Sequence, residues 1–254
     1  MKIVVNPSFD YLASFVKSIP DFFDREGETI YNERNHLKVF DTGNEKIIVK
    51  SFKVPVFFNR IIYTCFRASK AKRSYEHAIK LIGRQINTPP PVAYIEKQRK
   101  GLLTASYYVS IYREYPGTLR ELRYHTLEEK KDLASAFARF TAEIHEKAVF
   151  PLDYSPGNIL YEKTGDEYHF CLIDLNRMRF MPIDFKKGAY GLRRLWGNEE
   201  TIAFIAREYA KLRKFDERKY EELALRYHRL FWDKYSRKHR FFKPIMLKLF
   251  TDSR

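Results

Sequence analysis

The chain has 254 residues, 44% of them hydrophobic, so it is long enough to bury one or two cores and is not expected to be disordered. Its formal net charge is +15, which predicts attraction to a polyanion such as nucleic acid, a phosphorylated glycolipid or an anionic membrane surface. The two cysteines, Cys65 and Cys171, lie in no CxxC or histidine-rich setting, which argues against a disulfide scaffold or a zinc site and favours a reducing cytoplasm.

The N-terminal segment begins with an apolar run that breaks at Asn6 and Pro7. This run is shorter than the core of a signal peptide. No stretch of the chain approaches the ~20 apolar residues that a transmembrane helix needs. We therefore expect neither a signal peptide nor a membrane-spanning helix.

The first part of the chain predicts a strand and a short helix up to about Asp24, followed by a β-rich segment. Short β-type runs separated by turn residues predict three antiparallel strands, at residues 29–31, 35–41 and 46–52. The loop at residues 32–35 contains no glycine, unlike the glycine-rich loop that covers the phosphates in protein kinases.

Lys50 follows the apolar run 47–49 in the third of these strands. In kinases, a lysine at such a position pairs with the nucleotide phosphates. A lysine near the end of an edge strand is also a common solvated charge that blocks aggregation, so both interpretations stay open. A kinase further needs a glutamate on the following helix to orient the lysine. Glu76 lies in a segment where Tyr75, Ala78, Ile79 and Ile82 recur at helical spacing.

The Thr-Pro-Pro-Pro run at residues 88–91 ends this helix, and two more β-type runs follow at 91–98 and 105–117. The second run ends at Pro116-Gly117, a plausible hinge whose backbone could receive the edge of an adenine. From residue 127 onward the apolar spacing is mainly helical, and Asn198, followed by the acidic Glu199 and Glu200, predicts the start of a helix. The sequence therefore predicts an α+β fold with two domains, at residues 1–116 and 117–254.

The stretch from Leu152 to Arg177 contains the residue types that phosphoryl transfer requires. Asp153 is followed by Asn158, and a short strand then leads to Asp174. In kinases, one aspartate receives the proton of the substrate hydroxyl, while an asparagine and a second aspartate hold magnesium against the phosphates. The alternative is that these three are ordinary turn and cap residues.

Two regions combine basic and aromatic residues without acids, at residues 52–74 and 234–248. Such a composition suits contact with an anionic membrane surface or an anionic glycolipid. A solvated basic surface beside ordinary core residues is the competing interpretation. No nucleic-acid-binding motif is visible, so we expect no nucleic-acid partner.

Five residues occur in the order that the kinase-like superfamily requires: Lys50, Glu76, Asp153, Asn158 and Asp174. With them, the chain resembles this superfamily in its small bacterial branch, and it is most similar to the lipopolysaccharide core kinases that phosphorylate Kdo or heptose. The run RSYEHAIKLIGRQINTPPPVAYIE and the run CLIDLNRMRF carry this resemblance.

The resemblance implies a bilobal protein-kinase-like fold, with a small antiparallel β-rich N-lobe and a larger helical C-lobe. It implies ATP and Mg²⁺ as cofactors, with Lys50 binding the phosphates and Glu76 holding the lysine. Asp153 would be the catalytic base, and Asn158 and Asp174 the magnesium ligands.

Two positions depart from the family pattern. Pro151 stands where the family usually has the histidine of its His-x-Asp motif, and Leu175-Asn176 follows Asp174 in place of Phe-Gly. His145 is the nearest histidine before the loop, and a structural role that braces the loop through a hydrogen bond is favoured over proton transfer.

The expected function is an ATP-dependent kinase that phosphorylates a sugar hydroxyl of the lipopolysaccharide inner core. Its acceptor would be the lipopolysaccharide core or lipid A glycolipid, and it would act in the cytoplasm, peripherally bound at the inner face of the bacterial inner membrane. The alternatives are a small-molecule kinase of the aminoglycoside or choline type and a non-catalytic kinase-like binding module. The basic charge argues against an aminoglycoside acceptor, because a pocket for a cation should be acidic.

Overall fold

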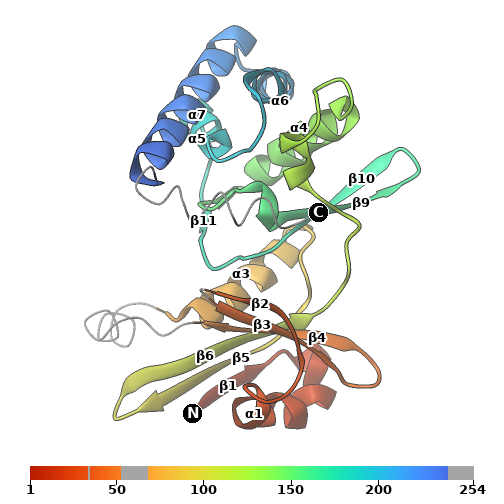
Figure 1. The fold of residues 1–254 in the computed structure, drawn as a ribbon, viewed down its shortest axis with the longest axis vertical. Coiled ribbons are helices and arrows are strands. Elements are labelled where there is room, and N and C mark those ends of the chain that lie inside the picture. The colour runs from red at the N-terminus through yellow and green to blue at the C-terminus, as the bar shows by residue number, and fades with distance from the viewer. Residues whose placement is uncertain (34, 53–67, 240–254) are drawn as a thin grey trace. The chain divides into compact units, whose positions relative to one another are not determined.

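The structure is a computed structural model that describes residues 1–33, 35–52 and 68–239 (Figure 1). The chain divides into two compact units. Unit 1 comprises Met1–Gly117, Leu160–Glu162 and His169–Met178, and unit 2 comprises Thr118–Ile159, Lys163–Tyr168 and Arg179–Arg254. Asp174, which lies after the predicted boundary, thus groups with unit 1.

Unit 1 is built on a six-stranded sheet in the order β1-β5-β6-β4-β3-β2, in which every neighbouring pair is antiparallel (Figure 1). The three strands predicted between residues 29 and 52 are present as β2 to β4, and the two predicted after the prolines are present as β5 and β6. The bounds are β1 Lys2–Val5, β2 Glu28–Asn32, β3 Asn35–Asp41, β4 Lys46–Phe52, β5 Pro91–Arg99 and β6 Leu102–Ile111.

Helices cover both faces of this sheet. The 3-10 helix η1 (Pro7–Leu12) and helix α1 (Ala13–Phe22) bury Val16 and Ile19 against one face, in a core shared with Ile95 of β5. Helix α3 (Lys70–Ile82) buries Ala71 beside Tyr94. Because neighbouring residues of a strand point to opposite faces, Ile95 and Tyr94 place α1 and α3 on opposite sides of the sheet.

The predicted helix around Glu76 is present as α3, and Ser69 caps its N-terminus by accepting from the backbone N–H of Lys72. Its buried side is formed by Ala71, Ser74, Ala78 and Leu81, spaced three or four residues apart. Ile79 and Ile82 are exposed, although their spacing alone suggested a share in the apolar face.

Unit 2 is mainly helical. The helices α4, α6 and α7 pack together around Phe137, Ile205 and Tyr220, which are fully buried. The bounds are η2 Leu119–Arg123, α4 Lys131–Glu146, η3 Pro156–Asn158, α5 Phe185–Leu192, α6 Glu199–Leu212 and α7 Glu217–His239. Asn198 caps α6 as its sequence predicts, since its side chain accepts a 2.8 Å hydrogen bond from the backbone N–H of Thr201.

Short strands complete the fold. Strands β9 (Ile159–Thr164) and β10 (Glu167–Leu172) are neighbours in a three-stranded sheet of order β10-β9-β7, where β7 is Gly117–Thr118. Strands β8 (Val149–Pro151) and β11 (Met178–Phe180) form a two-stranded sheet. Within residues 1–33, 35–52 and 68–239, no helix combines the length and apolar character of a membrane span.

Candidate active site

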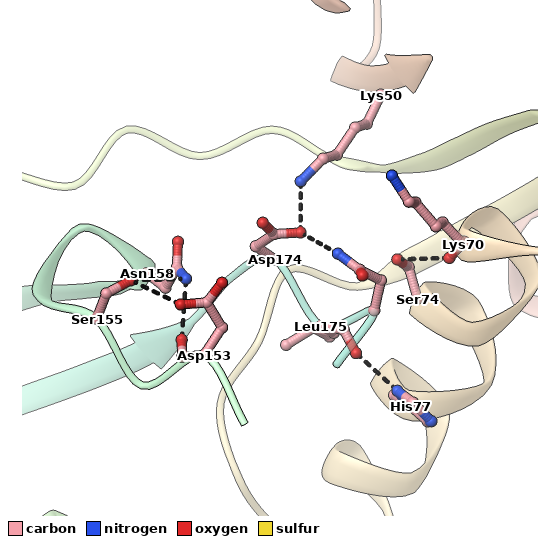
Figure 2. A network of polar contacts seen from close by, with 10 residues as sticks. Lys50, Lys70, Ser74, His77, Asp153, Ser155, Asn158, Asp174 and Leu175 are labelled. Carbon is pink, nitrogen blue, oxygen red and sulfur yellow. Dashed lines mark hydrogen bonds and ion pairs between the residues drawn. The ribbon is translucent and has the colours of Figure 1, made fainter. Parts of the chain in front are cut away.

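Lys50 and Asp174 form an ion pair within unit 1 (Figure 2). Lys50 points from β4, and its Nζ lies 2.6 Å from Oδ1 of Asp174, 124 residues later in the chain. The two side chains are 15% and 30% exposed, so the pair is partly shielded from water. The edge-charge interpretation of Lys50 is therefore wrong, because β4 is an interior strand of the sheet and Lys50 binds a specific carboxylate.

Asp174 has an unusual backbone conformation, with φ of +55°. This left-handed region is costly for a residue with a side chain, and such residues gather at functional sites. The side-chain amide of Asn176 donates a 2.6 Å hydrogen bond to the same oxygen, Oδ1, that binds Lys50. With both donors on Oδ1, Oδ2 is the oxygen best placed to bind a cation.

The segment that carries Asp174 is anchored at two points of unit 1. The backbone N–H of Leu172, at the end of β10, donates to the carbonyl of Asn87, and its carbonyl accepts from Thr88 Oγ1 at 2.8 Å. After Asp174, the carbonyl of Leu175 accepts a 2.6 Å hydrogen bond from Nδ1 of His77 on α3 (Figure 2). Desolvation by burial lowers the pKa of His77, which favours its neutral form with the proton on Nδ1.

Glu76 contacts a different lysine from the one that the sequence predicts. Its Oε1 lies 3.6 Å from Nζ of Lys72, one turn earlier on α3, and its side chain is 46% exposed. Among the described residues, the carboxylate partner of Lys50 is Asp174. Glu76 and Lys72 are one turn apart and so lie on the same face of α3, while the next residue, His77, contacts the Asp174 segment.

In unit 2, the loop between β8 and η3 carries Asp153. Its Oδ1 forms an ion pair with Nη2 of Arg194, at 3.0 Å, and accepts a 3.3 Å hydrogen bond from Ser155 Oγ. Arg194 follows α5, and its buried Nε has no hydrogen-bond partner in the part of the chain that the structure describes. Spacing and composition did not indicate this arginine, because the contact joins positions 41 residues apart.

Asn158 ends the same loop with its amide oriented by two hydrogen bonds. Its Nδ2 donates to the backbone carbonyl of Asp153 at 3.0 Å and to Ser155 Oγ at 3.1 Å (Figure 2). Both N–H groups of the amide are thereby used within the loop. Its Oδ1 is left to bind a cation, which is the role that the resemblance assigns to it.

Gly157 lies against the guanidinium of Arg120, in η2. A Cβ at this position would meet Arg120 Nη2 at 2.6 Å and Nε at 2.7 Å. The close approach therefore requires glycine unless Arg120 moves. Arg120 is a second arginine of this region that the sequence did not single out.

His145 has a structural role, but its hydrogen bond does not reach the loop. Its Nδ1 lies 2.8 Å from the hydroxyl of Tyr209 on α6, and its side chain is buried. Burial, with the charge of Arg213, lowers the pKa of His145 to about 3. The imidazole is therefore neutral at physiological pH and braces α4 against α6.

The residue types fit a magnesium ion held jointly with a nucleotide. Among the described residues, no cluster of three or more His, Cys, Asp or Glu could hold a metal by itself. Magnesium is commonly bound by one or two protein oxygens together with substrate phosphates, and needs no such cluster. Asp174 Oδ2 and Asn158 Oδ1 are oxygen donors of this kind.

The region 53–67 and residues 240–254 lie outside the described part of the chain, as does Arg34 of the predicted loop. The expected basic and aromatic membrane contact falls largely on these residues and stays a prediction.

Comparison with solved structures shows which known fold the chain resembles. No family model and no curated protein matches the chain. Among solved structures, it is similar to one described as WaaP in complex with acyl carrier protein, with a TM-score of 0.60 and 17% sequence identity over 91% of this chain and 100% of that chain. At this identity the likeness shows the fold alone, and it confirms the predicted α+β, kinase-like fold.

Proposed function

We propose that the protein is an ATP-dependent kinase that phosphorylates a sugar hydroxyl, of Kdo or heptose, in the lipopolysaccharide inner core. The ion pair between Lys50 and Asp174 carries this proposal. It joins a strand lysine to a carboxylate with a left-handed backbone, which is the pairing of parts that a kinase nucleotide site needs. The fold shared with WaaP supports it independently of these two residues.

Each residue would have a distinct role. ATP would supply the phosphoryl group, and a bound Mg²⁺ would offset the negative charge of its phosphates. Lys50 would exchange Asp174 for the nucleotide phosphates, and Asp174 and Asn158 would hold the metal through Oδ2 and Oδ1. The reaction requires all of these residues to serve one nucleotide.

Asp153 would orient the acceptor hydroxyl and take its proton as the new bond to phosphorus forms and the bond to the ADP leaving oxygen breaks. Arg194, at 3.0 Å from its Oδ1, would hold the carboxylate in one orientation toward the acceptor. Arg194 is therefore a positioning residue in this proposal.

The acceptor class rests on the sequence resemblance to lipopolysaccharide core kinases and on the net charge of +15, which suits a phosphorylated glycolipid. Peripheral binding to the cytoplasmic face of the inner membrane would bring the chain to this acceptor.

The direct test measures phosphate transfer from ATP to purified core oligosaccharide by mass spectrometry. Asp153→Asn should lower turnover by about 10²–10⁴-fold, because the proton acceptor is lost, while nucleotide affinity stays close to that of the wild type. Asp166→Asn, in the exposed turn between β9 and β10, is the matched control and should keep full activity.

Three outcomes would overturn the proposal. Undiminished transfer by Asp153→Asn would remove the assigned base. Transfer to choline or an aminoglycoside but not to core oligosaccharide would favour a small-molecule kinase. Magnesium-dependent nucleotide binding without ATP consumption on any acceptor would favour a binding module.

A further inference from the structure

Unit 2 contains a cavity of about 310 Å³ that no part of the proposed reaction has used. It is lined by residues from η2, the segment between α5 and α6, and α7: Arg123, Trp196, Gly197, Asn198, His228 and Trp232. The volume lies at the lower end of the range for small-molecule sites. The lining combines aromatic surface with a few polar groups, which is the usual composition of such sites.

The two indole rings are held in place by the surrounding chain. The guanidinium of Arg123 lies 5.3 Å from the ring centre of Trp196. Trp232 Nε1 donates to the carbonyl of Leu195 at 3.3 Å, and His228 Nε2 donates to the same carbonyl at 3.2 Å. The rings are thus fixed before a ligand arrives, which reduces the entropy that binding costs.

The polar groups offer a defined set of donors and acceptors. Asn198 uses its Oδ1 to cap α6, accepting from the backbone N–H and from the hydroxyl of Thr201, which leaves its NH₂ group as a donor. His228 donates through Nε2, so its Nδ1 is an acceptor, and burial lowers its pKa and keeps it neutral. Arg123 supplies a positive charge whose planar donors suit a carboxylate or a phosphate.

The cavity is connected to the loop of Asp153. The guanidinium of Arg120 lies 5.8 Å from the ring centre of Trp196, which lines the cavity. It also lies against Gly157, in the loop that follows Asp153. Arg194, which holds Asp153, belongs to the same short segment that carries Trp196. Arg120 and the segment that carries Arg194 and Trp196 thus link the lining of the cavity to the loop of the proposed catalytic base.

We propose that this cavity binds an anionic saccharide, a sugar acid of the acceptor, with the indoles against its apolar ring face, Asn198 and His228 on its hydroxyls, and Arg123 on its carboxylate. This proposal rests on the proposed kinase function and specifies which kind of sugar that function recognises. It distinguishes the two expected sugars, because Kdo carries a carboxylate and heptose does not.

The sequence makes the test direct. The chain contains two tryptophans, and both line this cavity, so intrinsic tryptophan fluorescence reports on it specifically. The full chain, without nucleotide, is titrated separately with the Kdo monosaccharide, with its methyl ester and with inorganic phosphate. We expect saturable changes in emission, with Kdo binding about tenfold more tightly than the ester, because the ester cannot form the charge-assisted hydrogen bond.

Three variants test which side chains give the preference for the acid. Arg123→Gln should bind Kdo and its methyl ester with equal affinity. Arg99→Gln, at the exposed end of β5, removes the same charge elsewhere and should keep the tenfold preference. Asn198→Asp retains the cap of α6 but replaces a donor with a negative charge, and should also lose the preference.

The proposal is overturned if Kdo leaves the emission unchanged, if wild type binds acid and ester alike, or if Arg123→Gln keeps the preference. Displacement of Kdo by inorganic phosphate at equal concentration would show an anion site without selectivity for sugar, and also overturns it. Binding of Kdo without phosphate transfer to any acceptor would sink the kinase proposal and leave the cavity proposal standing. Phosphate transfer by Arg123→Gln with an unchanged KM for core oligosaccharide would overturn the cavity proposal and leave the kinase proposal standing.

Discussion

The two carboxylates of the candidate site are neutralised by different cations. Asp174, in unit 1, is paired with Lys50 at 2.6 Å, while Asp153, in unit 2, is paired with Arg194 at 3.0 Å. A lysine is a point charge on a flexible stem, whereas an arginine is a rigid, planar group. The difference suits their proposed roles, because Lys50 has to exchange a carboxylate for phosphates and Arg194 has to keep Asp153 in one orientation.

Histidine supports each region in a different way. His77 holds the carbonyl of Leu175, next to Asp174, and is half-buried. His145 is buried, lies in α4 ahead of the Asp153 loop, and holds Tyr209. The Asp174 segment is therefore held by a histidine hydrogen bond, whereas His145 bonds to α6 and packs its ring against Phe150 of β8, before the Asp153 loop.

The largest expected effect comes from removing the charge of Asp174. Asp174→Asn should abolish magnesium-dependent nucleotide binding and lower phosphate transfer by about 10³-fold, because an anionic metal ligand is lost. Isothermal titration with a non-hydrolysable ATP analogue, with and without Mg²⁺, separates this variant from Asp153→Asn. Equal nucleotide affinity for both variants would contradict the proposal that Asp174 binds the metal and Asp153 acts only on the acceptor.

Removing the cation of Asp153 should have a smaller effect. Arg194→Gln should lower kcat about ten- to a hundredfold through misplacement of the carboxylate, with the KM for ATP unchanged. Arg194→Lys should restore only part of the loss, since a planar donor is replaced by a point charge. Arg193→Gln, whose guanidinium packs on Tyr190, is the neighbouring control. A raised KM for ATP with normal kcat would instead assign Arg194 to nucleotide binding.

Acid should destabilise the two histidine-supported regions unequally. The pKa of His145 is lowered from 6.5 to about 3, so below pH 6.5 the unfolded chain binds a proton that the folded chain does not. The associated stability is present at neutral pH and falls by about 2 kcal/mol between pH 7.5 and pH 5. Thermal unfolding over this range should show a weaker pH dependence for His145→Gln than for wild type.

His77→Gln is the comparison for that experiment. The pKa of His77 is lowered in the same direction, but its side chain is less buried than that of His145. Replacing His77 should therefore reduce the pH dependence of thermal unfolding less than replacing His145 does. Equal flattening by both substitutions would contradict the difference between the two supports.

The smallest effect is expected at Glu76. Because its exposed carboxylate contacts Lys72 at 3.6 Å, Glu76→Gln should change the free energy of unfolding by less than about 0.5 kcal/mol. Activity should stay within about twofold of wild type, as it should for Lys72→Gln. A loss above tenfold in Glu76→Gln alone would mean that Glu76 reaches Lys50 during turnover, as the resemblance implies.

Sequence patterns predicted the elements of the fold well where they depend on local chemistry. The strands β2 to β6, the helix α3 and the cap at Asn198 follow from short-range alternation, helical spacing and capping preference. The burial of α3 was less predictable, because a helix in a mixed fold has more than one apolar stripe, and Ile79 and Ile82 proved to be exposed.

In the candidate site, too, local patterns predicted some features and missed others. The sequence determined which side chains could take part, since Lys50, Asp153, Asn158 and Asp174 occur in the order that phosphoryl transfer needs. It could not determine their partners. The contacts of Arg194 with Asp153 and of His77 with Leu175 join positions 41 and 98 residues apart.

The sequence by itself thus determined the types of residue available for the chemistry, the kinase-like order of its motifs and the charge that suits an anionic acceptor. Only the tertiary structure decided that Lys50 binds Asp174, that Glu76 contacts Lys72, and that both tryptophans meet at one cavity. The physical reason is that propensity and spacing act over a few residues, whereas the partner of a charge or a ring is set by the packing of elements distant in the chain.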